Sequence, residues 1–105
     1  PEERAARRAV IARLTAAGAS LIDTAPAYRE SESTIGELLA EIGNRKSVFL
    51  ATKVTAQSGE RAEGIAMLAE SQRRLRSEVL DLVQVHNLMG ARVMLPVLRD
   101  WPAQR

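Results

Sequence analysis

Three short apolar segments, each ending in an ionisable side chain, constrain the fold of this chain most strongly. They lie at residues 19–23, 48–53 and 80–86, and their last residues are Asp23, Lys53 and His86, separated by 30 and 33 residues. Each segment has the length of a buried strand, and each interval is long enough for a helix. Parallel strands need a crossover of about this length, usually a helix with a right-handed connection. The pattern therefore predicts an α/β fold with a parallel sheet.

Helical periodicity fills the intervals between these strands. We predict helices over residues 4–17, from Ser31 or Thr34 to Gly43-Asn44, over residues 60–76, and after Gly90, where Pro96 and Pro102 limit the last one. Thr34 has Glu37 in capping-box register. The expected apolar faces are, in chain order, Ala6, Val10, Leu14 and Ala17; Ile35, Leu38, Leu39 and Ile42; Ile65, Leu68, Ala69 and Leu75; and Val93, Val97 and Trp101.

Two architectures use this alternation, an open doubly wound sheet and a closed (β/α)₈ barrel. Strands of the open form are apolar on both faces, whereas barrel strands direct alternate residues into a central core. Alternation assigns three layers of side chains to the inner face of the sheet. The top layer is Asp23, Lys53 and His86. The middle layer is Leu21, Ala51 and Gln84, and the bottom layer is Ala19, Phe49 and Leu82. The residues left for the helix-covered face are Ile22, Val48, Leu50, Val83 and Val85. This is the layering of a barrel interior, where Gln84 would need polar partners.

Composition narrows the classes of protein further. The 105 residues suffice for one small domain or a piece of a larger one, and 46% hydrophobic with 27% charged residues is ordinary globular composition. The net charge is only +2, so we expect no nucleic-acid partner, and the cluster Arg73, Arg74 and Arg76 is interpreted as a solvated helix end. One histidine and no cysteine make a metal site unexpected.

The sequence also bears on location. No apolar run approaches the roughly 20 residues of a membrane span, so we expect no membrane partner and a cytoplasmic location. The chain begins with Pro1 rather than Met, and we therefore expect its first residue not to be the natural start.

The strand ends carry the residues best suited to chemistry, because sites in parallel α/β folds assemble at the C-terminal edge of the sheet. Each residue alone has a structural alternative. Asp23 could accept hydrogen bonds in a turn, Lys53 could be a solvated cation, and His86 could be a satisfied structural residue. Tyr28 could merely cover a neighbouring element. Three titrating groups at equivalent strand ends nevertheless favour a shared site.

Three stretches of the sequence resemble the aldo-keto reductase family. They are IDTAPAYRESESTIGELL, FLATKV and SQRRLRSEVLDLVQVHN, and they occur in the family's order. The resemblance implies a (β/α)₈ TIM barrel without a Rossmann domain, which binds a nicotinamide cofactor, usually NADPH, and reduces aldehydes or ketones to alcohols. Residues 1–105 would then be a fragment of one such domain, with three strands and four helices, from the first barrel helix to the helix after the fourth strand.

The resemblance also implies roles for four residues. By matching motif, the family's catalytic residues become Asp23, Tyr28, Lys53 and His86. Tyr28 would be the general acid that protonates the carbonyl oxygen, and the Lys53 ammonium would favour the phenolate left behind. Asp23 would neutralise Lys53 and lie at the nicotinamide end of the cofactor, while His86 would hydrogen-bond the carbonyl oxygen of a small-molecule substrate.

Two departures from the family pattern stand out. The family usually has glycine after the catalytic tyrosine, where this chain has Arg29, so the position would need a backbone conformation that arginine resists. Arg29 is either a surface residue or a contact for an anionic substrate. The second departure is length, since a full barrel needs about 250 residues and most of the cofactor site lies outside this chain.

Two alternatives to a reductase segment stay open. One is a non-catalytic or regulatory protein of the same fold, resembling ion-channel β-subunits, and the other is an unrelated doubly wound α/β binding module. As an isolated polypeptide the chain is expected to be inactive. We also expect it to self-associate, because Leu21, Phe49 and Leu82 would be exposed beside two free sheet edges.

Overall fold

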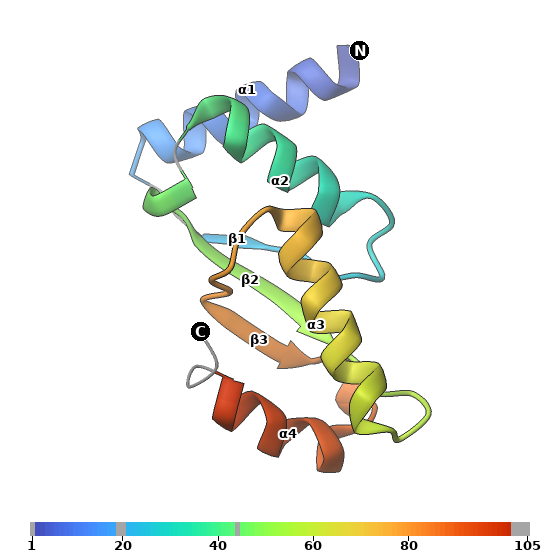
Figure 1. Ribbon diagram of the computed structural model, residues 1–105. Coiled ribbons are helices and arrows are strands. Elements are labelled where there is room, and N and C mark those ends of the chain that lie inside the picture. Colours follow the sequence, from blue (N-terminus) through green and yellow to red (C-terminus); the bar gives the residue numbers. More distant parts are fainter. Residues whose placement is uncertain (1, 19–20, 44, 102–105) are drawn as a thin grey trace.

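Helices and parallel strands alternate along the chain in the computed structural model, which describes residues 2–18, 21–43 and 45–101 (Figure 1). The elements are α1 (Glu2–Ala16), β1 (Leu21–Asp23), α2 (Ser31–Ile42), η1 (Arg45–Ser47), β2 (Phe49–Val54), α3 (Arg61–Leu75), β3 (Leu82–Val85), η2 (His86–Leu88) and α4 (Ala91–Asp100). The sheet order is β1-β2-β3, and both strand pairs are parallel. The predicted alternation of helices with a parallel sheet is thereby confirmed. No helix in the described ranges is long and apolar enough to cross a membrane.

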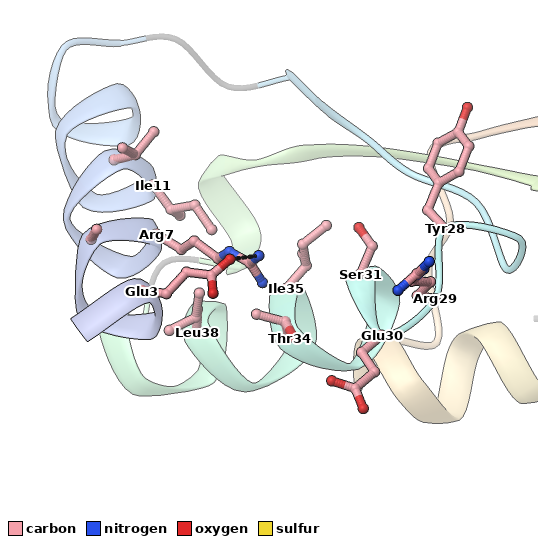
Figure 2. Close-up of a pocket in the computed structure, with 12 residues that line it drawn as sticks. Glu3, Arg7, Ile11, Tyr28, Arg29, Glu30, Ser31, Thr34, Ile35 and Leu38 are labelled. Atoms are coloured by element: carbon pink, nitrogen blue, oxygen red, sulfur yellow. Dashed lines mark hydrogen bonds and ion pairs between the residues drawn. The ribbon is translucent and has the colours of Figure 1, made fainter. Parts of the chain in front are cut away.

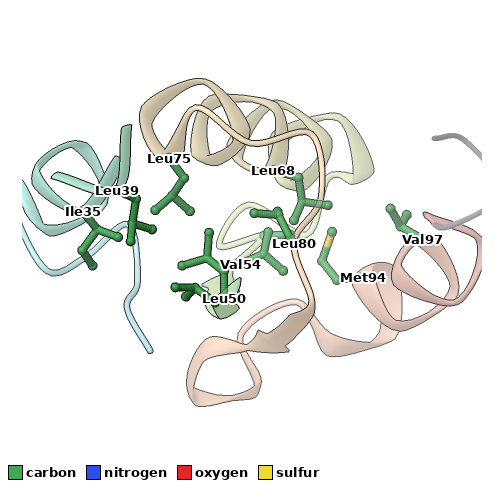
Figure 3. Packing of buried hydrophobic residues seen from close by; sticks show 11 residues of the cluster. Ile35, Leu39, Leu50, Val54, Leu68, Leu75, Leu80, Met94 and Val97 are labelled. Carbon is green, nitrogen blue, oxygen red and sulfur yellow. The ribbon is translucent and has the colours of Figure 1, made fainter. Parts of the chain in front are cut away.

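The core lies between the sheet and the helices α2, α3 and α4. Figure 3 shows Leu50 and Val54 of β2 directed toward Leu68 and Leu75 of α3, and all four side chains are at most 1% exposed. Burying a leucine of this kind stabilises a fold by roughly 2 kcal/mol. The helix-facing residues of the strands are therefore those predicted from alternation.

The opposite face of the sheet is open to solvent. Leu21, Phe49 and Leu82 are 63%, 44% and 43% exposed, although they are apolar. Gln84 on the same face is also exposed. The division of the strands into an inner and a helix-covered face is therefore confirmed.

The predicted layering of the inner face is wrong by two residues between neighbouring strands. Asp23 is paired with Ala51 rather than with Lys53, and Lys53 is paired with Gln84 rather than with His86. Strands that close into a barrel tilt against its axis and stagger their register, so equivalent strand ends are not level. In this register β2 extends three residues beyond the end of β1, whereas β2 and β3 end level at Val54 and Val85.

Several predicted boundaries shift. Residues 19–20 lie outside the described residues, as do Asn44 and Pro102. The third strand ends at Val85, so His86 begins η2 instead of ending a strand. Helix α2 begins at Ser31, and the capping box proposed at Thr34 is wrong because Thr34 lies within the helix. The predicted stop is confirmed, since Gly43 adopts φ 79° and its N–H is bonded to the Leu39 carbonyl.

The first helix departs most from its predicted packing. None of its residues is buried, and Val10 and Leu14 are 57% and 45% exposed. Figure 1 shows α1 lying on α2, away from the sheet. Arg4 forms ion pairs with Glu37 and Glu41 of α2, so charged side chains make part of this contact. Ala6 and Val10 of the predicted stripe line an open groove beside it.

The prediction is also wrong for one residue of the apolar face of α3. Ala69 is exposed, whereas the buried face of α3 consists of Gly64, Leu68, Ser71 and Leu75. These residues are spaced by four, three and four positions, which is the repeat of a helix stripe, and Ala69 lies to one side of it.

Candidate active site

Four side chains from different elements meet at the C-terminal edge of the sheet. Asp23 ends β1, Lys53 is the fifth residue of β2, and His86 directly follows β3. Tyr28 comes from the turn between β1 and α2. The structure therefore brings together all four residues that the sequence indicated.

Lys53 and Asp23 form an ion pair. The Nζ atom lies 3.2 Å from Oδ1 and 3.3 Å from Oδ2 of Asp23, and it also donates to the carbonyl of Thr24 at 3.0 Å. The Lys53 side chain is 13% exposed and that of Asp23 is 53% exposed. Because Asp23 is paired with Ala51, two residues before Lys53, the long lysine side chain reaches back along the sheet to make this contact.

Tyr28 contacts two of the other three site residues, Lys53 and His86. Lys53 Nζ lies 4.9 Å from the centroid of its ring, within the range of a cation–π contact. The ring meets that of His86 edge-on, with centroids 6.0 Å apart and an interplanar angle of 81°. Tyr28 is 47% exposed, and Figure 2 shows its hydroxyl directed away from α2. A cation and an imidazole thus flank an accessible phenol.

A small cleft lies beside this cluster. Its volume is about 320 Å³, and its lining includes Lys53, His86, Pro26, Met67 and Met89. Apolar walls with a few polar groups are typical of sites for small molecules.

A larger groove lies elsewhere, between α1 and α2. It measures about 830 Å³ and is lined by Val10, Ile11, Ile35 and Leu38, with Tyr28 at one end (Figure 2). Of the four site residues, Tyr28 is the one that lines it. The smaller cleft is lined by Lys53 and His86, but not by Tyr28 or Asp23, and with two of the four residues it is the better candidate for the site.

Arg29 has the backbone conformation that the sequence departure suggested. Its φ is 53°, in the left-handed region that favours glycine. Its side chain lines the groove between α1 and α2 (Figure 2). Residue 29 therefore shapes the turn that carries Tyr28.

Four polar residues next to the cluster were missed by sequence reasoning. Thr24 and Ser31 share a hydroxyl hydrogen bond of 2.6 Å, and Thr52 donates to Oε2 of Glu32 at 2.6 Å. A signal for Glu32 was present, because an acid stands in helical register with Gly36 and Leu39 on the buried side of α2. Thr52 likewise interrupts the apolar helix-facing side of β2.

Comparisons with known proteins show the family to which the sequence is related. The sequence pattern described as the aldo/keto reductase family matches residues 1–100. The chain is 38% identical to the aldo-keto reductase YhdN of Bacillus subtilis over 79 residues, which cover 66% of this chain and 24% of the relative. It is 36% identical to the methylglyoxal reductase YeaE of Escherichia coli over 90 residues, or 81% of this chain and 31% of the relative.

Solved structures confirm the predicted partial-barrel fold. An aldo-keto reductase crystallised with NADPH superposes with a TM-score of 0.72 and 26% identity, over 89% of this chain and 34% of that one. An aldo/keto reductase from Klebsiella pneumoniae, in complex with NADP and acetate, gives a TM-score of 0.77 at 23% identity over 95% of this chain and 38% of that one. At that identity the second match shows the fold alone. The chain spans between 24% and 38% of the length of these four proteins.

Proposed function

The chain belongs to the aldo/keto reductase family, and on that premise we propose that it supplies the acid–base residues of an NADP(H)-dependent oxidoreductase that reduces aldehydes or ketones to alcohols. The observation that supports this most is the Lys53 ammonium held between the Asp23 carboxylate and the Tyr28 ring. This arrangement pairs a proton donor with a fixed positive charge.

The residue types suit the proton-transfer half of the reaction. Carbonyl reduction adds a hydride to carbon and a proton to oxygen, and a positioned acid near the oxygen lowers the barrier. Tyr28 donates its hydroxyl proton to that oxygen. The negative charge left on the phenolate is stabilised by Lys53, whose own charge is balanced by Asp23.

His86 acts on the substrate oxygen in this proposal. Its ring lies beside Tyr28 and lines the same cleft as Lys53. An imidazole there orients the carbonyl by a hydrogen bond and stabilises the charge that develops on its oxygen.

The cleft fits part of the cofactor. At about 320 Å³ it suits a nicotinamide ring or a small carbonyl compound, and it is too small for a whole dinucleotide. The half-exposed carboxylate of Asp23, which does not line this cleft, can accept a further hydrogen bond at the nicotinamide end. When bound, the cofactor would supply the hydride. The groups that hold its phosphates would lie outside these 105 residues, so we expect the isolated chain to lack activity.

An NADPH fluorescence titration of the purified chain tests this division of the site. We expect weak and unsaturated binding. Saturable one-to-one binding by a monomer would contradict the proposal that most of the cofactor site lies elsewhere.

Expression of the complete reading frame that contains these residues tests the function itself. We expect oxidation of NADPH, and slower oxidation of NADH, when an aldehyde is added. Methylglyoxal is the first aldehyde to try, because it appears in the name of the E. coli relative. Absence of carbonyl-dependent oxidation across a panel of aldehydes and ketones would favour a non-catalytic protein of the same fold. The cytoplasmic location stays a prediction from the sequence.

A further inference from the structure

A buried carboxylate lies directly behind the candidate active site. Glu32, in the first turn of α2, is 1% exposed. Its Oε2 accepts a 2.6 Å hydrogen bond from Thr52, whose side chain is fully buried. Its Oε1 lies 3.5 Å from Nη1 of Arg74, an ion pair that lacks hydrogen-bond geometry in the described part of the chain. The mechanism proposed above gives this costly group no role.

The partner of Glu32 is the neighbour of Lys53. Successive residues of a strand point to opposite faces, so Thr52 faces the helices while Lys53 faces the site. Thr52 and Lys53 are joined by a peptide bond. The hydrogen bond from Thr52 to Glu32 therefore fixes the part of β2 that carries the Lys53 ammonium. A lysine side chain has many rotamers, and its contact with Tyr28 depends on where its backbone is held.

Glu32 itself sits on a rigid support. A Cβ atom placed on Gly36, one turn further along α2, would lie 2.2 Å from the carbonyl oxygen of Arg74. The backbones of α2 and α3 are therefore in direct contact at this level. Ser31, beside Glu32, is bonded to Thr24, which directly follows Asp23. The first turn of α2 thus holds the strand ends on both sides of the ion pair.

We infer that Glu32 is a positioning residue that keeps the Lys53 ammonium against Tyr28 and Asp23, acting through the side chain of Thr52. The inference rests on the proposed function for its catalytic meaning, whereas the geometry it asserts is measurable without activity. It accounts for a carboxylate in a buried site that an apolar residue would otherwise fill.

The test is nuclear magnetic resonance on the 105-residue chain. The sequence contains one tyrosine and two lysines, so cross-relaxation between the Lys53 ε-methylene and the Tyr28 ring is assignable. We expect this signal in the wild-type chain. Thr52→Val, which keeps the shape and removes the hydroxyl, is expected to lose at least about half of it, since the bond that locates the strand end is gone.

Two controls separate positioning from general loosening. Thr52→Ser keeps the hydroxyl and should retain the wild-type signal. Val97→Ala removes buried volume from α4, away from the strand end, and should also retain it. An unchanged signal in Thr52→Val, or an equal loss in Val97→Ala, would overturn the inference.

A second variant covers the case in which Thr52→Val does not fold. Glu32→Leu combined with Thr52→Val replaces both partners by apolar groups and leaves no buried carboxylate. We expect a folded chain, by circular dichroism, with the Lys53–Tyr28 signal reduced. Unfolding of both variants would also contradict the inference, since the bond would then serve the fold rather than the position of Lys53.

Kinetics of the complete protein add an independent measurement. Thr52→Val is expected to lower kcat about ten-fold or more while the KM for NADPH is unchanged. Thr52→Ser, which keeps the hydroxyl, is expected to have the kcat of the wild-type protein. If the wild-type protein reduces no carbonyl compound, the proposed function fails. The resonance experiment on the chain still decides the role of Glu32.

Discussion

The ammonium of Lys53 lies 4.9 Å from the centroid of the Tyr28 ring, although Lys53 belongs to β2 and Tyr28 to the turn after β1. One strand–turn–helix–strand unit therefore brings together the proposed proton donor and its cation. Asp23 completes the ion pair from the same unit. Three of the four residues of the proposed acid–base centre thus come from residues 23–53, and His86 joins them from the end of β3.

The turn that carries Tyr28 is strained at Arg29, whose φ is 53°. A residue with a Cβ atom in this region costs about 1–2 kcal/mol relative to glycine, offset by the greater freedom of glycine in the unfolded chain. Arg29→Gly is therefore expected to raise the free energy of unfolding by about 0.5–1 kcal/mol in urea denaturation. Arg29→Ala keeps the Cβ atom and serves as the control, and equal stabilisation by alanine would rule out the backbone explanation.

The open face of the sheet predicts association of the isolated chain. Phe49 and Leu82 are exposed on it, and β1 and β3 are the edges of the described sheet. Sedimentation velocity should give a mass above the 11.5 kDa of the monomer. Leu82→Lys should shift the mass toward the monomer, because a charge on this face opposes stacking and edge pairing. Leu95→Lys, on the surface of α4, should have little effect. A wild-type monomer at all concentrations would refute this prediction.

The start of α3 predicts a pH-dependent contribution to stability. Hydrogen bonds from the side chain and backbone of Ser58, and from the backbone of Gln57, lower the pKa of Glu63 below its ordinary 4.5. A carboxyl whose pKa is lowered by folding stabilises the fold above its unfolded pKa, and the contribution disappears as the pH falls through the folded pKa. Glu63→Gln should therefore lower Tm at pH 7 and leave it nearly unchanged at pH 2. An equal loss at both pH values would contradict this.

The convergence of the site was predictable because each strand ends in a polar residue at the same edge of a parallel sheet. The register of these residues between neighbouring strands was not predictable. The two-residue stagger between Asp23 and Lys53 comes from the tilt of the strands, which leaves no local pattern in the sequence. Periodicity identified the apolar stripe of α1, but it carries no information on the surface that α1 contacts. Val10 therefore proved exposed.

The buried residues that hold the site in place were harder to predict than the four site residues themselves. An acid in the first turn of a helix is ordinarily a dipole contact, so the register of Glu32 with Gly36 and Leu39 was a weak signal of its burial. Its hydrogen bond to Thr52 joins residues 20 apart in the chain. Such a pairing depends on how α2 packs on the sheet, which is a property of the tertiary structure.

The proposed proton donor is tested most directly by Tyr28→Phe in the complete protein, with turnover of an aldehyde and the Kd for NADPH both measured. Phenylalanine keeps the ring beside Lys53 and His86 and removes the proton. We predict a fall in kcat of at least about 100-fold, the lower end of what a general acid contributes, with the Kd for NADPH within about two-fold of the wild-type value. Retained turnover in Tyr28→Phe would contradict the assignment of Tyr28 as the proton donor.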